Sequence, residues 1–389
     1  MKKNKLLKLF SIVLAVIILL QIAYSLLPSF KTKQTTVTGE QKLKSCQEVT
    51  ELSLKTQCEE EAINIILSSQ GTDAAFEAVA KLSEQNPNFG ASCHGFVHEI
   101  GQFAYQLFKD KKDFEISPKI TICNYGFYHG FMETLVQQTG NFEEARNFCV
   151  LINTQLEKHG LNLTGECYHG IGHGNVDQHN AQQWSNPEKV VDSSIELCQK
   201  VAIDDRQFVD CSSGVFNGVA NLYSSGQYGL IINKDDPFWI CRKQDERVQK
   251  TCYAFMARTL LKLTNSNLAQ AIDLASRTAP TNYLENIIAN ITVLPSNISE
   301  EELVNLCGSL DEKTEIACLK GYAISLLQSG QPGKEYQSPI NFCNSDLLTL
   351  EEKQMCFENI LPQLKNYYPK DQLEKICQSV DNSYRYLCI

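Results

Sequence analysis

The spacing of the sixteen cysteines constrains the fold of this chain more than any other feature of its sequence. Even numbers of cysteines at recurring separations are typical of disulfide bonds formed in an oxidising compartment. Zinc sites favour cysteines two to four residues apart, and the chain has no CxxC motif. The sequence therefore predicts seven disulfides between neighbours in the chain: Cys46 with Cys58, Cys149 with Cys167, Cys198 with Cys211, Cys241 with Cys252, Cys307 with Cys318, Cys343 with Cys356, and Cys377 with Cys388.

Cys93 and Cys123 have no partner close in sequence. By elimination we expect them to pair with each other. The alternative is that they are thiol ligands or redox-active thiols beside nearby histidines.

The segments that begin at the second cysteine of a pair form an internal repeat. CNYGFYHGF, CYHGIGHGN and CSSGVFNGV, from Cys123, Cys167 and Cys211, each have glycine three and seven residues after the cysteine. Successive units are offset by 44, 44 and 41 residues from Cys123 to Cys252. Periods of this length are typical of stacked helical hairpins.

Segments such as FEEARNFCVLI and SEEELVNLCGSL place apolar residues at steps of three and four, which favours an all-α fold. We expect each unit to be an αα-hairpin: helix A ends near the first cysteine, and helix B opens at the second. The hairpins stack as an open solenoid or as an α/α toroid, and the sequence does not choose. Residues 46–300 contain the Gly- and His-rich B helices, whereas 301–389 keep the cysteine spacing and are predicted to be repeats with a cap.

Three consecutive B helices carry glycines four residues apart: Gly126 and Gly130, Gly170 and Gly174, and Gly214 and Gly218. Glycine in a helix costs about 1 kcal/mol relative to alanine, so another interaction must offset this cost. Glycines on one helix face allow a neighbouring backbone to approach closely. We therefore predict an inner layer of tightly packed B helices.

The N-terminus predicts a membrane anchor. Residues 1–8 form a basic tip, 9–27 an uncharged apolar run of about 28 Å as a helix, and 28–45 a polar stalk. The basic tip should stay in the cytoplasm, which places the rest of the chain in the periplasm, at the cell surface or in a lumen. A cleaved signal peptide ending near 23–25 is the alternative to an uncleaved signal-anchor. The net charge of −10 argues against a nucleic-acid partner.

Five of the seven histidines follow the cysteines of the predicted B helices: His94, His98, His129, His169 and His173. In HGFVH and HGIGH two histidines are four residues apart, so both rings face one side of a helix and can bind one ion. Equivalent positions of stacked repeats are neighbours, so the sequence predicts a site for a divalent transition metal, zinc or iron. Gly95 and Gly170 stand where the zincin motif HExxH has its catalytic glutamate, so that chemistry is not supported.

Other polar residues extend this pattern. Glu133 and Asp177 lie one turn after His129 and His173, and we interpret them as catalytic candidates that orient ligands or act as a general base. At the repeat position of His129 and His173 the next units carry Asn217 and Arg258, which are candidate ligand-binding residues. The alternative for Arg258 is a salt bridge at a helix interface.

Two functional hypotheses follow from these patterns. The first is a membrane-anchored helical-repeat protein with a multi-histidine metal site, extending to metal-dependent hydrolysis. The alternative is a non-enzymatic scaffold that binds a protein or a surface polymer. In that case the histidines hydrogen-bond carbonyls at helix contacts. A third interpretation, separate from both hypotheses, is that the histidines catalyse acid–base reactions without metal. Convergence of the five histidines in the fold would favour the first hypothesis.

Overall fold

The structure is a computed structural model that describes residues 38–85, 90–111, 115–293 and 298–388. The predicted basic tip 1–8 and membrane span 9–27 lie outside the described residues. Among the helices that are described, none has the length and apolar character needed to cross a membrane. At the C-terminal end of the predicted stalk, α2 forms and packs against α3.

Within the described part of the chain, all regular elements are helices and none is a strand, as the sequence predicts. The α-helices are α2 (Gly39–Cys46), α3 (Leu52–Gln70), α4 (Thr72–Gln85), α5 (Gly90–Lys111), α6 (Gly126–Thr139), α7 (Phe142–Leu156), α8 (Thr164–Asp177), α9 (Pro187–Val201), α10 (Asp205–Ser225), α11 (Glu246–Met256), α12 (Arg258–Leu263), α13 (Leu268–Thr278), α14 (Leu284–Thr292), α15 (Glu300–Cys307), α16 (Glu312–Gln328), α17 (Gln337–Cys343), α18 (Leu350–Ile360), α19 (Leu364–Tyr367) and α20 (Lys370–Gln378). The 3₁₀ turns are η2 (Pro118–Thr121), η3 (Glu157–His159), η4 (Gln183–Ser185), η5 (Gln227–Gly229), η6 (Cys241–Lys243), η7 (Thr281–Tyr283), η8 (Leu361–Gln363) and η9 (Arg385–Cys388).

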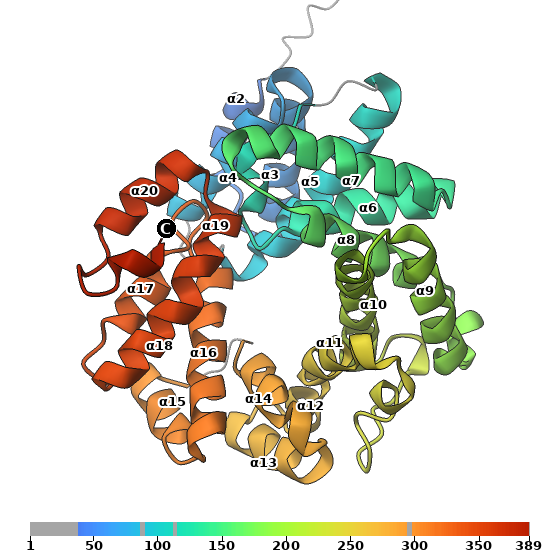
Figure 1. Cartoon of the computed structure of the whole chain (residues 1–389). Coiled ribbons are helices and arrows are strands. Elements are labelled where there is room, and N and C mark those ends of the chain that lie inside the picture. Colours follow the sequence, from blue (N-terminus) through green and yellow to red (C-terminus); the bar gives the residue numbers. More distant parts are fainter. Residues whose placement is uncertain (1–37, 86–89, 112–114, 294–297, 389) are drawn as a thin grey trace, which may run out of the picture.

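The helices form a closed ring around a central opening (Figure 1). The inner layer runs α5, α6, α8, α10, α11, α14, α16 and α18, each helix packing against the next. Helices α7, α9, α13, α15 and α17 lie on the outside, packed on the inner layer. The ring is the α/α toroid of the two architectures that the sequence left open.

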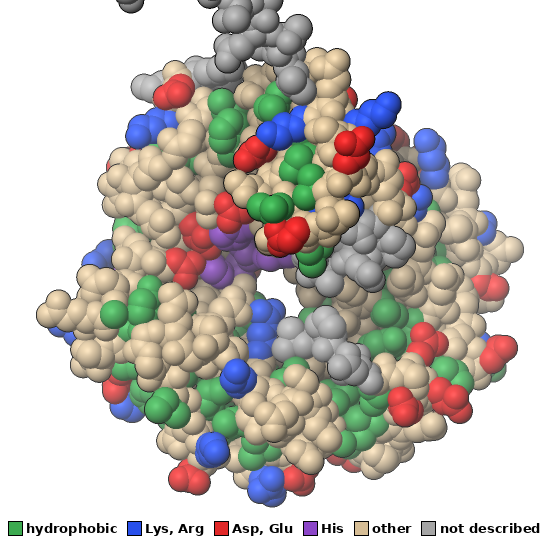
Figure 2. Space-filling model, turned by 180° about the vertical axis from the view of Figure 1, so that it is seen from behind, with side chains coloured by type: hydrophobic (Ala, Val, Ile, Leu, Met, Phe, Trp, Pro, Cys, Tyr) green, Lys and Arg blue, Asp and Glu red, His purple; other side chains and the backbone are tan. Residues whose placement is uncertain are grey.

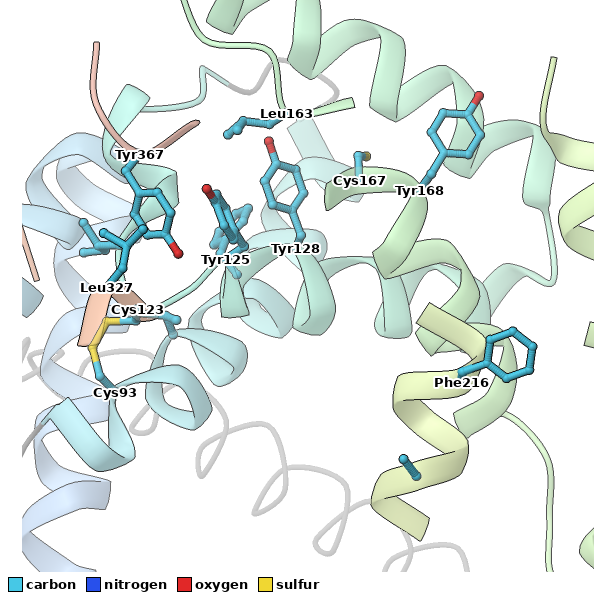
Figure 3. Close-up of a cluster of buried hydrophobic side chains, with 14 of the residues drawn as sticks. Cys93, Cys123, Tyr125, Tyr128, Leu163, Cys167, Tyr168, Phe216, Leu327 and Tyr367 are labelled. Carbon is cyan, nitrogen blue, oxygen red and sulfur yellow. A yellow bond between two sulfur atoms is a disulfide. The ribbon is translucent and has the colours of Figure 1, made fainter. Parts of the chain in front are cut away.

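Contacts between the two ends of the repeat array close the ring. The Thr121 hydroxyl donates a hydrogen bond to the carbonyl of Tyr367 at 2.7 Å, and the Tyr125 hydroxyl donates to the carbonyl of Asn366 at 3.1 Å. The rings of Tyr125 and Tyr367 also pack together at 5.2 Å, beside the Cys93–Cys123 disulfide (Figure 3). The C-terminal repeats are therefore more than a cap, because they complete the toroid.

All sixteen cysteines are paired, and every pair is the one predicted. The bond between Cys343 and Cys356, for example, joins the outer helix α17 to the inner helix α18. Cys93 and Cys123 join α5 to the turn before α6, so the thiol alternative for these two residues is wrong. The disulfides thus fasten segments that are neighbours in the chain to one another.

The prediction that B helices open at the second cysteine of a pair is wrong for most units. Helices α3 and α10 begin well before Cys58 and Cys211, which lie inside them. In α10 the earlier start is set by Asp204, whose side chain caps the helix by accepting a hydrogen bond from the backbone of Gln207. The start of α10 therefore follows its capping residue and not its cysteine.

One hairpin of the ring has no disulfide. Helices α13 and α14 lie in the long gap between Cys252 and Cys307, and α14 packs between α11 and α16 in the inner layer. This unit could not be predicted from the cysteine spacing, because it contains no cysteine.

The predicted glycine contacts are confirmed. A Cβ added to Gly130 would lie 1.8 Å from the carbonyl oxygen of His98, and one added to Gly214 would lie 1.9 Å from that of His169. Gly101 and Gly172 make equally close approaches that the repeat alignment did not identify, at 2.2 Å and 1.9 Å from neighbouring carbonyl oxygens. The inner helices therefore touch through their backbones.

Burial of Glu335 near the ring closure makes stability depend on pH. Glu335 is 2% exposed, and the hydroxyl of Tyr368 and the backbone of Gly333 donate hydrogen bonds to its carboxyl group. Burial raises the pKa of Glu335 to about 7 from its ordinary 4.5. Between these values the folded state binds more protons than the unfolded state, so this group's stabilisation is lost as the pH rises through about 7.

We expect Glu335→Gln to become progressively more stable than the wild type between pH 4.5 and 7, by up to about 3 kcal/mol. The amide keeps the shape of the protonated carboxyl but never ionises. Urea unfolding of both proteins across this pH range measures the difference. The same substitution at Glu374, an exposed carboxyl on α20, is the control and should give a much flatter difference. Parallel curves for Glu335→Gln and the wild type would contradict the prediction.

Candidate functional site

The five histidines predicted to form a site converge on the inner wall of the ring. The ring centroid of His129, on α6, lies 5.0 Å from His94 and 6.4 Å from His98, both on α5. It lies 5.1 Å from His169 and 5.0 Å from His173, both on α8. Figure 2 shows histidine side chains gathered at the central opening with acidic side chains beside them. We call these five residues the histidine cluster.

The glycine contacts explain why the histidines meet. Gly126 and Gly130 on α6 face the carbonyls of His94 and His98 on α5, so α5 and α6 lie backbone to backbone. Gly174 brings α8 onto α6 beside Glu133. Helices this close bring side chains at equivalent repeat positions within contact distance, and His129 becomes the centre of the cluster.

Two carboxylates, Glu133 and Asp177, contact histidines of the cluster. Glu133 lies between two helices, with one oxygen 3.0 Å from Nε2 of His98 and the other 2.8 Å from Nδ1 of His173. Asp177 Oδ2 is also 2.8 Å from His173 Nδ1. One ligand atom each from Glu133, His173 and Asp177 lie within 4.8 Å of one another, close enough to hold a metal ion.

This arrangement revises the roles predicted for the carboxylates. The sequence predicted that Glu133 and Asp177 orient the metal ligands or act as a general base. The structure instead groups Asp177 with His173 and with Glu133 of the neighbouring helix, without His169. Glu133 and Asp177 are therefore candidate ligands as well as candidates for acid–base roles.

The charges within this group are strongly coupled. Burial disfavours a charged His173, but the carboxylates of Asp177 and Glu133 outweigh it and raise the pKa of His173 to about 10. Burial also opposes ionisation of Glu133, yet hydrogen bonds from His173 and His98 hold its pKa below the ordinary value. Buried Glu133 and half-buried Asp177 thus hold a positive charge on His173, and a metal ion bound here would replace the His173 proton.

The other three histidines are neutral at neutral pH. Burial, followed by repulsion from neighbouring imidazoles, holds the pKa of His129 well below its ordinary value. Burial lowers the pKa of His169 to about 3 and also lowers the pKa of His94. Neutral imidazole is the form that binds metals.

Protein partners already hold two of these neutral rings. His94 Nδ1 lies 3.1 Å from the carbonyl of Cys123, as the packing interpretation expects. His169 contacts the Ser213 hydroxyl at 2.7 Å through Nδ1 and the Asn217 amide at 3.1 Å through Nε2. By contrast, no hydrogen bond joins the ring of His129 to a described residue.

Asn217 and Arg258, the two predicted ligand-binding residues, are in direct contact. Arg258 Nη1 donates a hydrogen bond to Asn217 Oδ1 at 2.9 Å, and the guanidinium lies 5.2 Å from the ring centroid of Phe255. Both residues line a pocket of about 360 Å³ inside the ring, which we call the central pocket. His129 and His169 line the same pocket, so the histidine cluster forms part of its wall.

Glu166 is a site residue that the sequence reasoning missed. It lines the central pocket from α8, and burial, together with the charge of Asp210, raises its pKa to about 7. A carboxyl with such a pKa can both donate and accept a proton near neutral pH. Glu166 directly precedes Cys167, so an alignment that starts at the cysteine begins one residue too late to include it.

No protein-family model matches the chain, and comparisons with curated proteins and with solved structures found no significant match. The class of the protein therefore follows from its fold and site alone. It is a disulfide-bonded helical ring whose inner wall carries a group of histidines and carboxylates able to hold a metal ion.

Proposed function

We propose that this chain is a membrane-anchored, extracytoplasmic metalloprotein that holds a divalent transition metal, zinc or iron, inside its ring. Glu133, His173 and Asp177 would bind the ion, and the placement of their ligand atoms within 4.8 Å is the observation that carries the proposal. His98, which contacts Glu133, is the candidate fourth ligand. The eight disulfides support an oxidising compartment, and the predicted span at 9–27 would supply the anchor.

The energetics of the inner wall favour a cation at this position. Glu133 is 6% exposed, and a carboxylate removed from water costs several kcal/mol unless a cation compensates. Without an ion the protonated His173 supplies that positive charge, and a metal ion would supply it for both carboxylates by displacing the proton. Histidine nitrogen and carboxylate oxygen are ligands that both zinc and iron accept, so the set of Glu133, His173 and Asp177 suits either metal.

The functional class that fits best is metal-dependent hydrolysis. When bound, such an ion would act as a Lewis acid and activate water. The residues of the chain would do the remaining work: Glu133 orients the rings of His98 and His173, and Glu166 can exchange a proton with a molecule in the central pocket.

Metal analysis of the full-length chain, purified in detergent without added metal, tests the proposal. We expect close to one zinc or iron per chain, removal of the metal by EDTA, and a higher melting temperature when zinc is returned, because an ion that binds only the folded state stabilises it. Absence of metal, together with an unchanged melting temperature after zinc addition, would overturn the proposal and favour the non-enzymatic scaffold.

A further inference from the structure

Arg258 carries a charge inside the central pocket that no described carboxylate balances. Its guanidinium contacts the neutral amide of Asn217 and the ring of Phe255, and burial lowers its pKa to about 10. Glu166 lines the same pocket, yet no ion pair joins it to Arg258. The guanidinium of Arg258 therefore presents N–H donors that suit a carboxylate or phosphate, and no described carboxylate occupies them.

The rest of the pocket wall offers uncharged polar groups. Within the described structure, the side chains of Gln328, Gln363 and Thr251 line the pocket without making a hydrogen bond to another residue. Gln328 belongs to α16 and Gln363 to η8, whereas Arg258 begins α12. The pocket is thus assembled from both halves of the ring and exists only because the ring closes.

We propose that the central pocket binds a small polyhydroxylated organic anion, such as a sugar acid or sugar phosphate, whose acid group pairs with Arg258. Its hydroxyl groups would bind the amides of Gln328 and Gln363 and the hydroxyl of Thr251. A pocket of about 360 Å³ is of small-molecule size. Binding of this anion does not depend on the proposed function. The further step, that the anion is the substrate of the metal site, rests on the proposed function.

The position of the pocket links it to the candidate metal group. His129 lines the pocket, and its ring stacks on that of His173 at 5.0 Å. A molecule held by Arg258 would therefore lie against the histidine cluster. The need to pair Arg258 with an acid group would give the protein a means of selecting anionic over neutral substrates.

Calorimetric titration of the full-length, EDTA-treated protein with glucuronate, glucose 6-phosphate and glucose tests the proposal. We expect saturable binding of at least one of the two anions, at least tenfold tighter than binding of glucose. The anion that binds more tightly identifies carboxylate or phosphate as the preferred acid group. Failure of both anions to bind, or equal binding of glucose, would overturn the proposal.

Variants separate this inference from the metal proposal. Arg258→Met should weaken anion binding at least tenfold while leaving the melting temperature unchanged or raised, because it removes an uncompensated charge. Arg258→Lys keeps the positive charge but loses the paired N–H donors of the guanidinium, so it should weaken anion binding less than Arg258→Met does. Arg247→Met, at an exposed arginine paired with Asp205 and Asp245, is the matched control and should bind normally.

If Arg258 had only a structural role, Arg258→Met would lower the melting temperature. The Arg258→Lys protein and any Arg258→Met protein that folds would then keep their affinity for the anion. His173→Ala distinguishes the two proposals, since it should remove metal binding and leave anion binding within about twofold. Loss of anion binding only in the metal-site variant would contradict a pocket centred on Arg258.

Discussion

Replacing Gly214 with alanine is expected to destabilise the ring by several kcal/mol or prevent its folding, although alanine is the better helix former by about 1 kcal/mol. The added methyl group would lie 1.9 Å from the backbone oxygen of His169 and 2.8 Å from the backbone nitrogen of His173. Neither is the tip of a flexible side chain, so α8 and α10 would have to separate. The free-energy cost of that separation should exceed the roughly 1–3 kcal/mol that is usual for overpacking.

Gly95→Ala is the matched control. Gly95 lies in α5 between two histidines of the cluster, but a Cβ there would meet no atom within 4 Å. We expect this variant to be as stable as the wild type or up to about 1 kcal/mol more stable. Urea unfolding of the two variants gives the comparison, and equal stabilities would disprove backbone contact between inner helices.

Gly170 should give an intermediate result. An added Cβ would lie 3.0 Å from Cγ of Met132, which is a flexible side chain, and 3.1 Å from the carbonyl oxygen of Tyr128. Nothing in the sequence separates Gly170 from Gly214, because both stand three residues after a cysteine. The difference arises from what lies opposite each glycine on the neighbouring helix.

Local patterns predicted the parts of the structure that repeat. The cysteine separations identified seven of the disulfides because the partners are 11 to 18 residues apart in sequence. The bond between Cys93 and Cys123, which are 30 residues apart, followed only by elimination. The histidines converge for a related reason: stacking the same unit places His129 and His173 at equivalent positions of adjacent helices.

Closure of the ring was not predictable in this way. It depends on contacts such as Thr121 with Tyr367 and Lys334 with Glu84, which join residues far apart in sequence. A solenoid built from the same hairpins would have the same helix periodicity and disulfides. The pairing of Glu133 with His173 was missed for a similar reason, since it depends on how α6 and α8 are offset along their axes.

Glu133→Gln is expected to weaken zinc or iron binding at least a hundredfold. The amide has the size of the carboxylate but lacks the charge that attracts a cation, and it cannot accept hydrogen bonds at both terminal atoms. Glu133 contacts both His98 and His173, so the substitution also releases the two rings that it orients. Metal content and the zinc-induced change in melting temperature measure the effect.

His173→Ala should abolish metal binding as well, whereas His159→Ala should retain it because His159 is exposed on η3, outside the histidine cluster. The packing interpretation makes a different prediction: Glu133→Gln would lower the melting temperature of the metal-free protein, and zinc would change wild type and variant equally. A metal centre requires that the variant lose its response to zinc. The two interpretations therefore differ in the zinc response and not in stability alone, since a buried carboxylate between two imidazoles contributes to the folded state in either case.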